Sequence, residues 1–301
     1  MTPTLPRLAR AVRSPRVAVL GGGAIGLASA LALTRRGARV RVYDRGGGAS
    51  ACAAGMLGLT YEADELAECG LLDLARRAIE LWPAFAADVE ALSGRRIDYR
   101  PEGTLACAAD GAELETMGRR MARMRALGFK VQDLTLAELR AAEPALSGAL
   151  GAWRLVSDGQ VDAGLLTPAL AEAVRAAGGE LAIGQGVGRL EAEADGVRTP
   201  DGERWDRVLV ATGAGAGVEA VGPDGPETIG GVRALTPVKG QMLALRPGPN
   251  PLRHVIRAER VYIAPKSRWV LVGATSEPGR ADDEVSPMAL AALRAEAARL
   301  C

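Results

Sequence analysis

Residues 16–45 read RVAVLGGGAIGLASALALTRRGARVRVYDR and carry, in order, the signals of a dinucleotide-binding unit. Residues 17–20 are a short apolar strand, and Gly21, Gly23 and Gly26 give the spacing G-x-G-x-x-G at the expected turn into a helix. The first glycine allows the tight turn, the second lets the backbone approach a pyrophosphate, and the third lets helix and strand pack closely. The helix N-terminus offers N–H groups and a positive dipole end to phosphates.

A second expected strand at residues 40–43 ends in Asp44, 23 residues after Gly21. A carboxylate at this place accepts hydrogen bonds from a ribose 2′-hydroxyl, and its charge repels a 2′-phosphate. The stretch therefore predicts FAD or NAD rather than NADP. The alternative is a glycine-rich helix start without a ligand, but the full series of strand, turn, helix, strand and acid favours a nucleotide.

Length and composition restrict the class of protein. A chain of 301 residues buries a large core and is expected to form two domains. A formal charge of +1 gives no reason to expect nucleic acid or an anionic membrane as a partner. Four scattered cysteines show neither a disulfide framework nor metal-ligand spacing, which favours a reducing cytoplasm and no metal.

One segment imitates a signal peptide or membrane anchor. Residues 17–34 are uncharged for 18 residues and follow Arg7, Arg10, Arg13 and Arg16. The nucleotide-binding unit explains the apolar run better, because a parallel strand buried on both faces is apolar throughout and four glycines weaken a spanning helix. We therefore expect no membrane span.

Periodicity and turn signals predict the other elements. Thr135, followed three residues later by Glu138, is typical of a helix N-cap. The expected helices are 63–92, 111–127, 134–142, 165–177 starting near Thr167-Pro168, and 286–301 starting at Ser286-Pro287. The expected strands include 97–99, 103–107, 207–210, 240–245, 261–265 and 269–274.

Nucleotide-unit features stand at both ends of the first 215 residues, which predicts interleaved domains rather than two consecutive ones. The predicted fold class is α/β, with a Rossmann-like FAD-binding domain interleaved with an α+β substrate domain built on an antiparallel sheet. We expect a flexible tail at 1–14, the FAD-binding domain at 15–92 and 145–230, and the substrate domain at 93–144 and 231–301.

Five runs extend the argument to a family: SACAAGMLG at 50–58, DGQVDAGLLTPAL at 158–170, VLVATGAGAG at 208–217, TPVKGQMLAL at 236–245, and VYIAPK with WVLVGATSE across 261–277. Through them the chain resembles the glycine oxidases of thiamine biosynthesis, in the D-amino-acid oxidase and sarcosine oxidase group. The resemblance implies an FAD-dependent oxidoreductase that acts on a small amino-acid substrate with molecular oxygen. A homo-oligomer is left open.

The resemblance and the nucleotide motif together assign the site. In the family, the loop at 50–56 borders the isoalloxazine, and a backbone group at Val187 touches the adenine side. The expected cofactor-binding residues are Gly21, Gly23, Ala24, Ile25, Gly26, Asp44, Arg45, Ser50, Ala53, Ala54, Gly55, Met56, Val187, Thr212 and Gly213. Tyr262, Met56 and Ser276 match positions that line the substrate pocket.

The single histidine, His254, leaves almost no material for Ser–His or Cys–His catalysis, and the family mechanism needs none. The resemblance implies that a hydride passes from the substrate Cα to flavin N5, that oxygen reoxidises the flavin, and that the imine hydrolyses or supplies thiazole synthesis. Pocket groups mainly orient the carboxylate and Cα.

The match stops early. Family members continue into a Gly-Leu-Arg-Pro run whose arginine binds the substrate carboxylate, and neither that run nor the later glycine-rich segment is present here. We therefore expect a chain that lacks the C-terminal part of the family fold and has little glycine oxidase activity. The alternatives are a related FAD enzyme acting on sarcosine, D-amino acids or 2-hydroxy acids, and a catalytically silent FAD-binding remnant.

Overall fold

The computed structural model describes residues 14–214, 217–222, 225–228 and 235–301. The chain divides into two compact units, and each is built from two separate stretches of sequence. Unit 1 comprises residues 1–47 and 170–233, and unit 2 comprises residues 48–169 and 234–301. The predicted tail lies, apart from Ser14, outside the described residues. The functional domain boundaries at residues 92, 144 and 230 stay a prediction.

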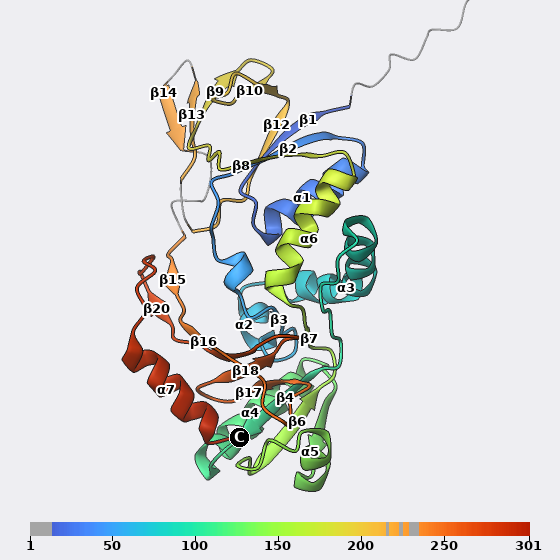
Figure 1. Cartoon of the computed structure of the whole chain (residues 1–301), viewed down its shortest axis with the longest axis vertical. Coiled ribbons are helices and arrows are strands. Elements are labelled where there is room, and N and C mark those ends of the chain that lie inside the picture. Colours follow the sequence, from blue (N-terminus) through green and yellow to red (C-terminus); the bar gives the residue numbers. More distant parts are fainter. Residues whose placement is uncertain (1–13, 215–216, 223–224, 229–234) are drawn as a thin grey trace, which may run out of the picture. The chain divides into compact units, whose positions relative to one another are not determined.

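A parallel sheet organises unit 1 (Figure 1). Its strand order is β12-β1-β2-β8, with β12 at Arg207–Val210, β1 at Arg16–Leu20, β2 at Arg39–Asp44 and β8 at Glu180–Ile183. Helix α1, Ala24–Arg35, connects β1 to β2 and packs against both. The central strand β1 is buried and apolar from Val17 to Leu20, as expected for a parallel strand covered on both faces.

A smaller sheet completes unit 1. Its strand order is β11-β10-β9-β13-β14. The bounds are β9 Arg189–Glu193, β10 Gly196–Arg198, β11 Arg204–Trp205, β13 Glu219–Gly222 and β14 Gly225–Thr228. Buried side chains of both sheets form one core, in which the rings of Tyr43 and Trp205 meet edge to face at 6.1 Å.

A seven-stranded sheet organises unit 2, in the order β16-β19-β18-β17-β4-β6-β5. The bounds are β4 Thr104–Ala108, β5 Val131–Leu134, β6 Gly151–Leu155, β16 Met242–Leu245, β17 Val255–Arg257, β18 Tyr262–Pro265 and β19 Val270–Gly273. All neighbours are antiparallel except β17 and β4, which are parallel. Two short pairs accompany it, β3 Met56–Leu57 with β7 Gly159–Gln160, and β15 Val238–Lys239 with β20 Glu277–Pro278.

Helices cover this sheet (Figure 1). Helix α4 packs on β4 and β5, α5 on β5 and β6, and α7 on β16 and β19. The remaining bounds are η1 Ser50–Cys52, α2 Ala63–Glu68, α3 Leu72–Ser93, α4 Gly111–Ala126, α5 Leu136–Ala142, α6 Ala163–Ala176 and α7 Pro287–Ala298. None of the helices in the described residues has the length and apolar character that crossing a lipid bilayer requires.

The predicted fold class is confirmed, with a parallel sheet in one unit and a largely antiparallel sheet in the other. Three local predictions were wrong. The helix expected at 63–92 is two helices, α2 and α3, which are separated at Gly70, where φ is +68°. Helix α6 begins at Ala163 rather than near Pro168, because the Asp162 carboxylate accepts a hydrogen bond from the Leu165 N–H at 3.2 Å and starts the helix earlier. Residues 97–99 are not a strand, because Asp98 has a φ of 53°.

The capping box at α5 gives a test of local stability. The Thr135 hydroxyl accepts from the Glu138 N–H at 3.2 Å, and the Glu138 carboxylate accepts from the Thr135 N–H at 2.8 Å. Thr135→Ala should lower the free energy of unfolding by about 1 kcal/mol, whereas Thr135→Ser should keep the cap. Urea denaturation of both variants measures this; equal losses would contradict the capping role.

Candidate functional site

The carboxyl end of β1 has no room for side chains. A Cβ on Gly21 would fall inside van der Waals contact of the Ala211 carbonyl, and one on Gly26 inside contact of the Gly21 carbonyl. The φ of Gly21 is +107°, which favours glycine. Gly23 is the N-cap residue of α1 and has extended backbone. The tight turn and the close helix–strand packing predicted from the sequence are both present.

Asp44 lies directly beside this turn. A Cβ on Gly22 would lie 2.9–3.0 Å from the Asp44 side chain. Within the described part of the chain, the Asp44 carboxylate makes no hydrogen bond or ion pair. The arrangement leaves an acceptor at the edge of the parallel sheet, next to a glycine turn, as a ribose-binding acid requires.

The other nucleotide residues of unit 1 gather at the same edge. The Thr212 N lies 3.1 Å from a Cβ placed on Gly21, and Gly213 has a φ of +63°. The Arg45 Cβ lies 3.0 Å from a Cβ placed on Gly186, which adjoins Val187. Ala24 and Ile25 occupy the first turn of α1, and the Ile25 side chain is exposed. The residues present fit a bound dinucleotide.

In unit 2, the predicted flavin-bordering loop is fixed by backbone contacts. Ser50 opens η1, and Ala53 ends it. Gly55 has a φ of +66°, and its carbonyl accepts from the Val161 N–H at 2.8 Å. A Cβ on Gly55 would overlap the Val161 carbonyl, so the loop lies flat against residue 161.

Met56 and Tyr262, both predicted pocket residues, lie on one face of the seven-stranded sheet. They pack in one cluster with Ala54, which is buried, and with Met242. The Tyr262 hydroxyl donates to the Met242 Sδ at 2.6 Å. Gly273 lies between these two side chains in the strand register, and a Cβ there would overlap the tyrosine ring. Burial raises the pKa of Tyr262.

A buried carboxyl fixes the chain that follows β3. Asp158 is 2% exposed and accepts from the N–H groups of Thr60 at 2.6 Å and Tyr61 at 3.3 Å. Burial raises the pKa of this carboxyl to about 6, although the two donors and the Arg257 charge act in the opposite direction. Asp158 therefore fixes the backbone of Tyr61, whose ring lies against the Arg257 guanidinium, with the Arg257 Cζ 4.0 Å from the ring centroid.

Lys266 is a buried cation close to the loop at Gly55. Its side chain is buried, and its ammonium donates to the Gln160 Oε1 at 2.9 Å and to the Val161 carbonyl at 3.0 Å. Both acceptors are neutral, and burial lowers the pKa of Lys266 to about 8. The backbone of Val161 is therefore held at its N–H by the Gly55 carbonyl and at its carbonyl by Lys266.

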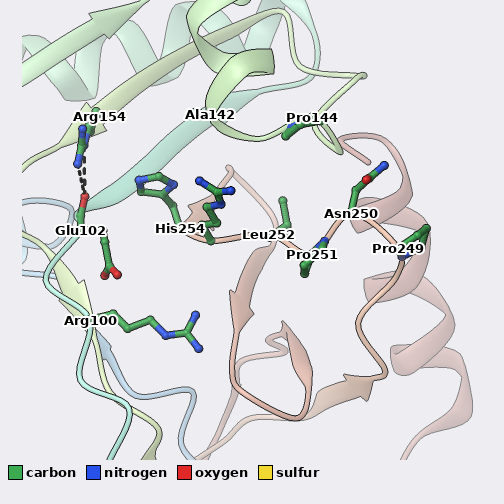
Figure 2. Close-up of a pocket in the computed structure, with 11 residues that line it drawn as sticks. Arg100, Glu102, Ala142, Pro144, Arg154, Pro249, Asn250, Pro251, Leu252 and His254 are labelled. Atoms are coloured by element: carbon green, nitrogen blue, oxygen red, sulfur yellow. Dashed lines mark hydrogen bonds between the residues drawn. The ribbon is translucent and has the colours of Figure 1, made fainter.

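A cavity of about 620 Å³ lies elsewhere in unit 2, and none of the predicted site residues lines it. Figure 2 shows its basic wall, where Arg154 donates to the Glu102 carbonyl. His254 also lines it, and the His254 ring is committed to Glu143, a buried carboxylate 2.7 Å from its Nδ1. The single histidine therefore has a structural role in this cavity wall. The described residues contain no group of three or more histidine, cysteine or acidic side chains placed to bind a metal.

Ser276 does not belong to the cluster that contains Met56 and Tyr262. It follows β19, is exposed, and makes no hydrogen bond with Met56 or Tyr262 in the described part of the chain. Sequence reasoning missed Gly22 and Gly273, which make room for Asp44 and Tyr262. Within the run 21–23 the motif needs glycine at positions 21 and 23 only, so the third glycine between them was a signal for Gly22. No local signal marks Gly273, because its role depends on the strand register.

Three comparisons bear on this site. A family model described as "FAD dependent oxidoreductase" matches residues 16–301. The chain is 34% identical over 279 residues to a glycine oxidase of Geobacillus kaustophilus, and the aligned part covers 90% of this chain and 72% of that protein. It is 31% identical to a bifunctional protein ThiO/ThiG of Trichormus variabilis, covering 87% of this chain but only 39% of that protein. The crystal structure of the Geobacillus kaustophilus glycine oxidase matches with a TM-score of 0.80 and 32% identity, covering 95% of this chain and 78% of that one.

The buried Lys266 gives a pH-dependent prediction. The unfolded side chain holds its proton up to a pKa near 10.5, and the folded one releases it near pH 8, so between these values the unfolded state binds more protons. The unfolding free energy should therefore rise with pH across this window, by about 3 kcal/mol from Lys266.

Lys266→Met should remove that rise, and Lys130→Met, at an exposed lysine, should leave it unchanged. Urea unfolding at pH 7.5, 9 and 10.5 measures the three slopes. Parallel slopes for wild type and Lys266→Met would show that the lysine keeps its proton when buried.

Proposed function

Because the chain belongs to the family of FAD-dependent oxidoreductases, we propose that it oxidises the Cα–N bond of glycine or another small amino acid. The products are the imine and then, after hydrolysis, the 2-oxo acid and ammonia. For glycine the balance is glycine, oxygen and water in, glyoxylate, ammonia and hydrogen peroxide out. The bifunctional ThiO/ThiG relative supports a role in thiamine (thiazole) biosynthesis. The scattered cysteines of the sequence favour the cytoplasm as the place of this reaction.

FAD is the cofactor of this family, and the prediction of FAD from the sequence is confirmed. When bound, FAD accepts a hydride equivalent from the substrate and passes the electrons to oxygen. The glycine turn and Asp44 would hold its adenosine diphosphate part, with the acid on the ribose. The flat loop at Gly55 would border the ring system.

The contribution of the pocket residues is orientation rather than acid–base chemistry. The His254 ring is bonded to Glu143, so it is committed elsewhere. Met56 and Tyr262 form an apolar wall with one hydroxyl, and this wall would exclude water and hold Cα over the cofactor. Positioning of this kind lowers the activation barrier substantially, because a misplacement of about 1 Å can cost about a hundredfold in rate.

The observation that carries the proposal is the Asp44 carboxylate, which lies beside Gly22 and has no partner among the residues that the structure describes. Asp44→Ala should weaken FAD binding by about 1–3 kcal/mol, because ribose hydroxyls would lose a charged acceptor. Asp195→Ala, at an exposed acid in the same unit, should have no effect. Equilibrium dialysis with FAD and with NADPH measures this. Tighter binding of NADPH than of FAD would refute the assignment.

Peroxide release tests the reaction. The match covers 72% of the Geobacillus glycine oxidase, and the uncovered part of that protein can be joined to this chain. The FAD-loaded chain and the joined protein are each supplied with glycine, sarcosine, D-alanine or glycolate. We expect the fastest release with glycine, and faster release in the joined protein. Preference for glycolate would indicate a 2-hydroxy-acid enzyme, and FAD binding without turnover in both proteins would indicate a silent FAD-binding protein.

A further inference from the structure

Arg257 brings a positive charge to the face of the sheet that carries Met56 and Tyr262. It ends β17 and stands opposite Tyr262 in the antiparallel register, so the two side chains share a face. The Arg257 Cζ lies 6.0 Å from the Tyr262 ring centroid, and its Nη1 lies 3.3 Å from the Met56 Sδ. The side chain of Arg257 is only 15% exposed.

The guanidinium group of Arg257 is poorly paired for a charge so far out of water. One Nη contacts a thioether, which is a weak acceptor. The other makes a single 3.3 Å contact with the Glu62 carboxylate, whose side chain is 44% exposed. The Nε–H has no partner in the described part of the chain. A long ion pair with a partly exposed carboxylate contributes little to stability, so another anion can replace Glu62.

A structural arginine in the same unit shows the difference. Arg100 makes a two-pronged bond to Asp98, with distances of 2.8 and 2.6 Å. An arginine–carboxylate fork of this kind is the strong geometry. Arg257 is about as buried as Arg100, whose side chain is 22% exposed, but lacks any comparable fork. Its donors are therefore available to a carboxylate that approaches over the sheet.

An aromatic stack holds the Arg257 guanidinium in place. Its Cζ lies 4.0 Å from the Tyr61 ring centroid, and the Arg120 Cζ lies 4.2 Å from the same centroid. The ring itself is fixed by Asp158 at its backbone and by the Ala258 carbonyl at its hydroxyl. Stacking leaves the edge of the guanidinium, where the N–H groups point, free to bind a planar anion.

We propose that Arg257 binds the carboxylate of the amino-acid substrate beside Met56 and Tyr262, in place of its contact with Glu62. The inference rests on the proposed function. It adds an anchor within this chain to the arginine that the family resemblance places in the Gly-Leu-Arg-Pro run. Glu62, which competes for the same guanidinium, then weakens carboxylate binding.

Acetate is the probe, because it is a carboxylate that offers no amine or hydroxyl for oxidation, and acetamide is its neutral counterpart. Binding of each to the FAD-loaded chain is measured by NMR titration. Arg257→Gln should weaken acetate binding by at least tenfold, the loss expected for hydrogen bonds to a charged group, and should leave acetamide binding unchanged. Arg257→Lys should lie between, because it keeps the charge but not the fork.

Glu62→Gln separates this role from a structural ion pair. It should tighten acetate binding, because the competing carboxylate is gone. Arg268→Gln, the same change at an exposed arginine of the same unit, should have no effect. If Arg257 only pairs with Glu62, then Arg257→Gln and Glu62→Gln will both lower stability and neither will change acetate affinity; that result would overturn the proposal.

Failure of the proposed function has a different signature, namely a chain that does not retain FAD. The acetate titration is then repeated without FAD, and equal affinities in wild type and Arg257→Gln would again count against Arg257. If Arg257→Gln does not fold, the comparison rests on Arg257→Lys and Glu62→Gln, whose acetate affinities must shift in opposite directions.

Discussion

The close approach of three backbones at the end of β1 is the constraint on which the nucleotide-binding unit depends. Gly21 faces the Ala211 carbonyl on one side, and its own carbonyl faces Gly26 on the other. Any side chain at either glycine would push α1 or β12 away from β1. Because the backbones meet there, the N-terminus of α1 is at the sheet edge, and Asp44 reaches the same edge from the adjacent strand. A phosphate site and a ribose acceptor thus follow from one steric requirement.

This unit could be predicted because its information is local. Strand, turn, helix and acid fall within residues 16–44, so spacing alone places Asp44 beside the turn. The same holds for the capping box at Thr135 and Glu138, which are three residues apart. Residues 97–99 were predicted wrongly because their alternation of apolar and polar side chains imitates a strand, whereas the positive φ of Asp98 is stabilised by its bond to Arg100.

The substrate-facing sheet could not be predicted in the same way. Its strands β17 and β4 lie side by side although about 150 residues separate them in sequence, and the pairing is parallel in an otherwise antiparallel sheet. Met56 and Tyr262 were assigned by resemblance, and the structure places them in one cluster. The role of Gly273 becomes visible only when the register is known, because it makes room for a side chain of the neighbouring strand. The register also distinguishes Arg257 from the other arginines near Tyr262, because it places Arg257 directly opposite Tyr262.

Two charges stand out when the described residues are compared. A fully paired group is Arg299, whose guanidinium bonds Asp110, Glu113 and Glu296. Asp44 has no protein partner, and Arg257 has a long contact in a largely buried place. A fold optimised for stability alone would pair or replace a guanidinium as buried as that of Arg257, because an uncompensated charge out of water is costly. Under the proposed function each group has a ligand to complete it. The acid would accept hydrogen bonds from a ribose, and the cation would bind an amino-acid carboxylate.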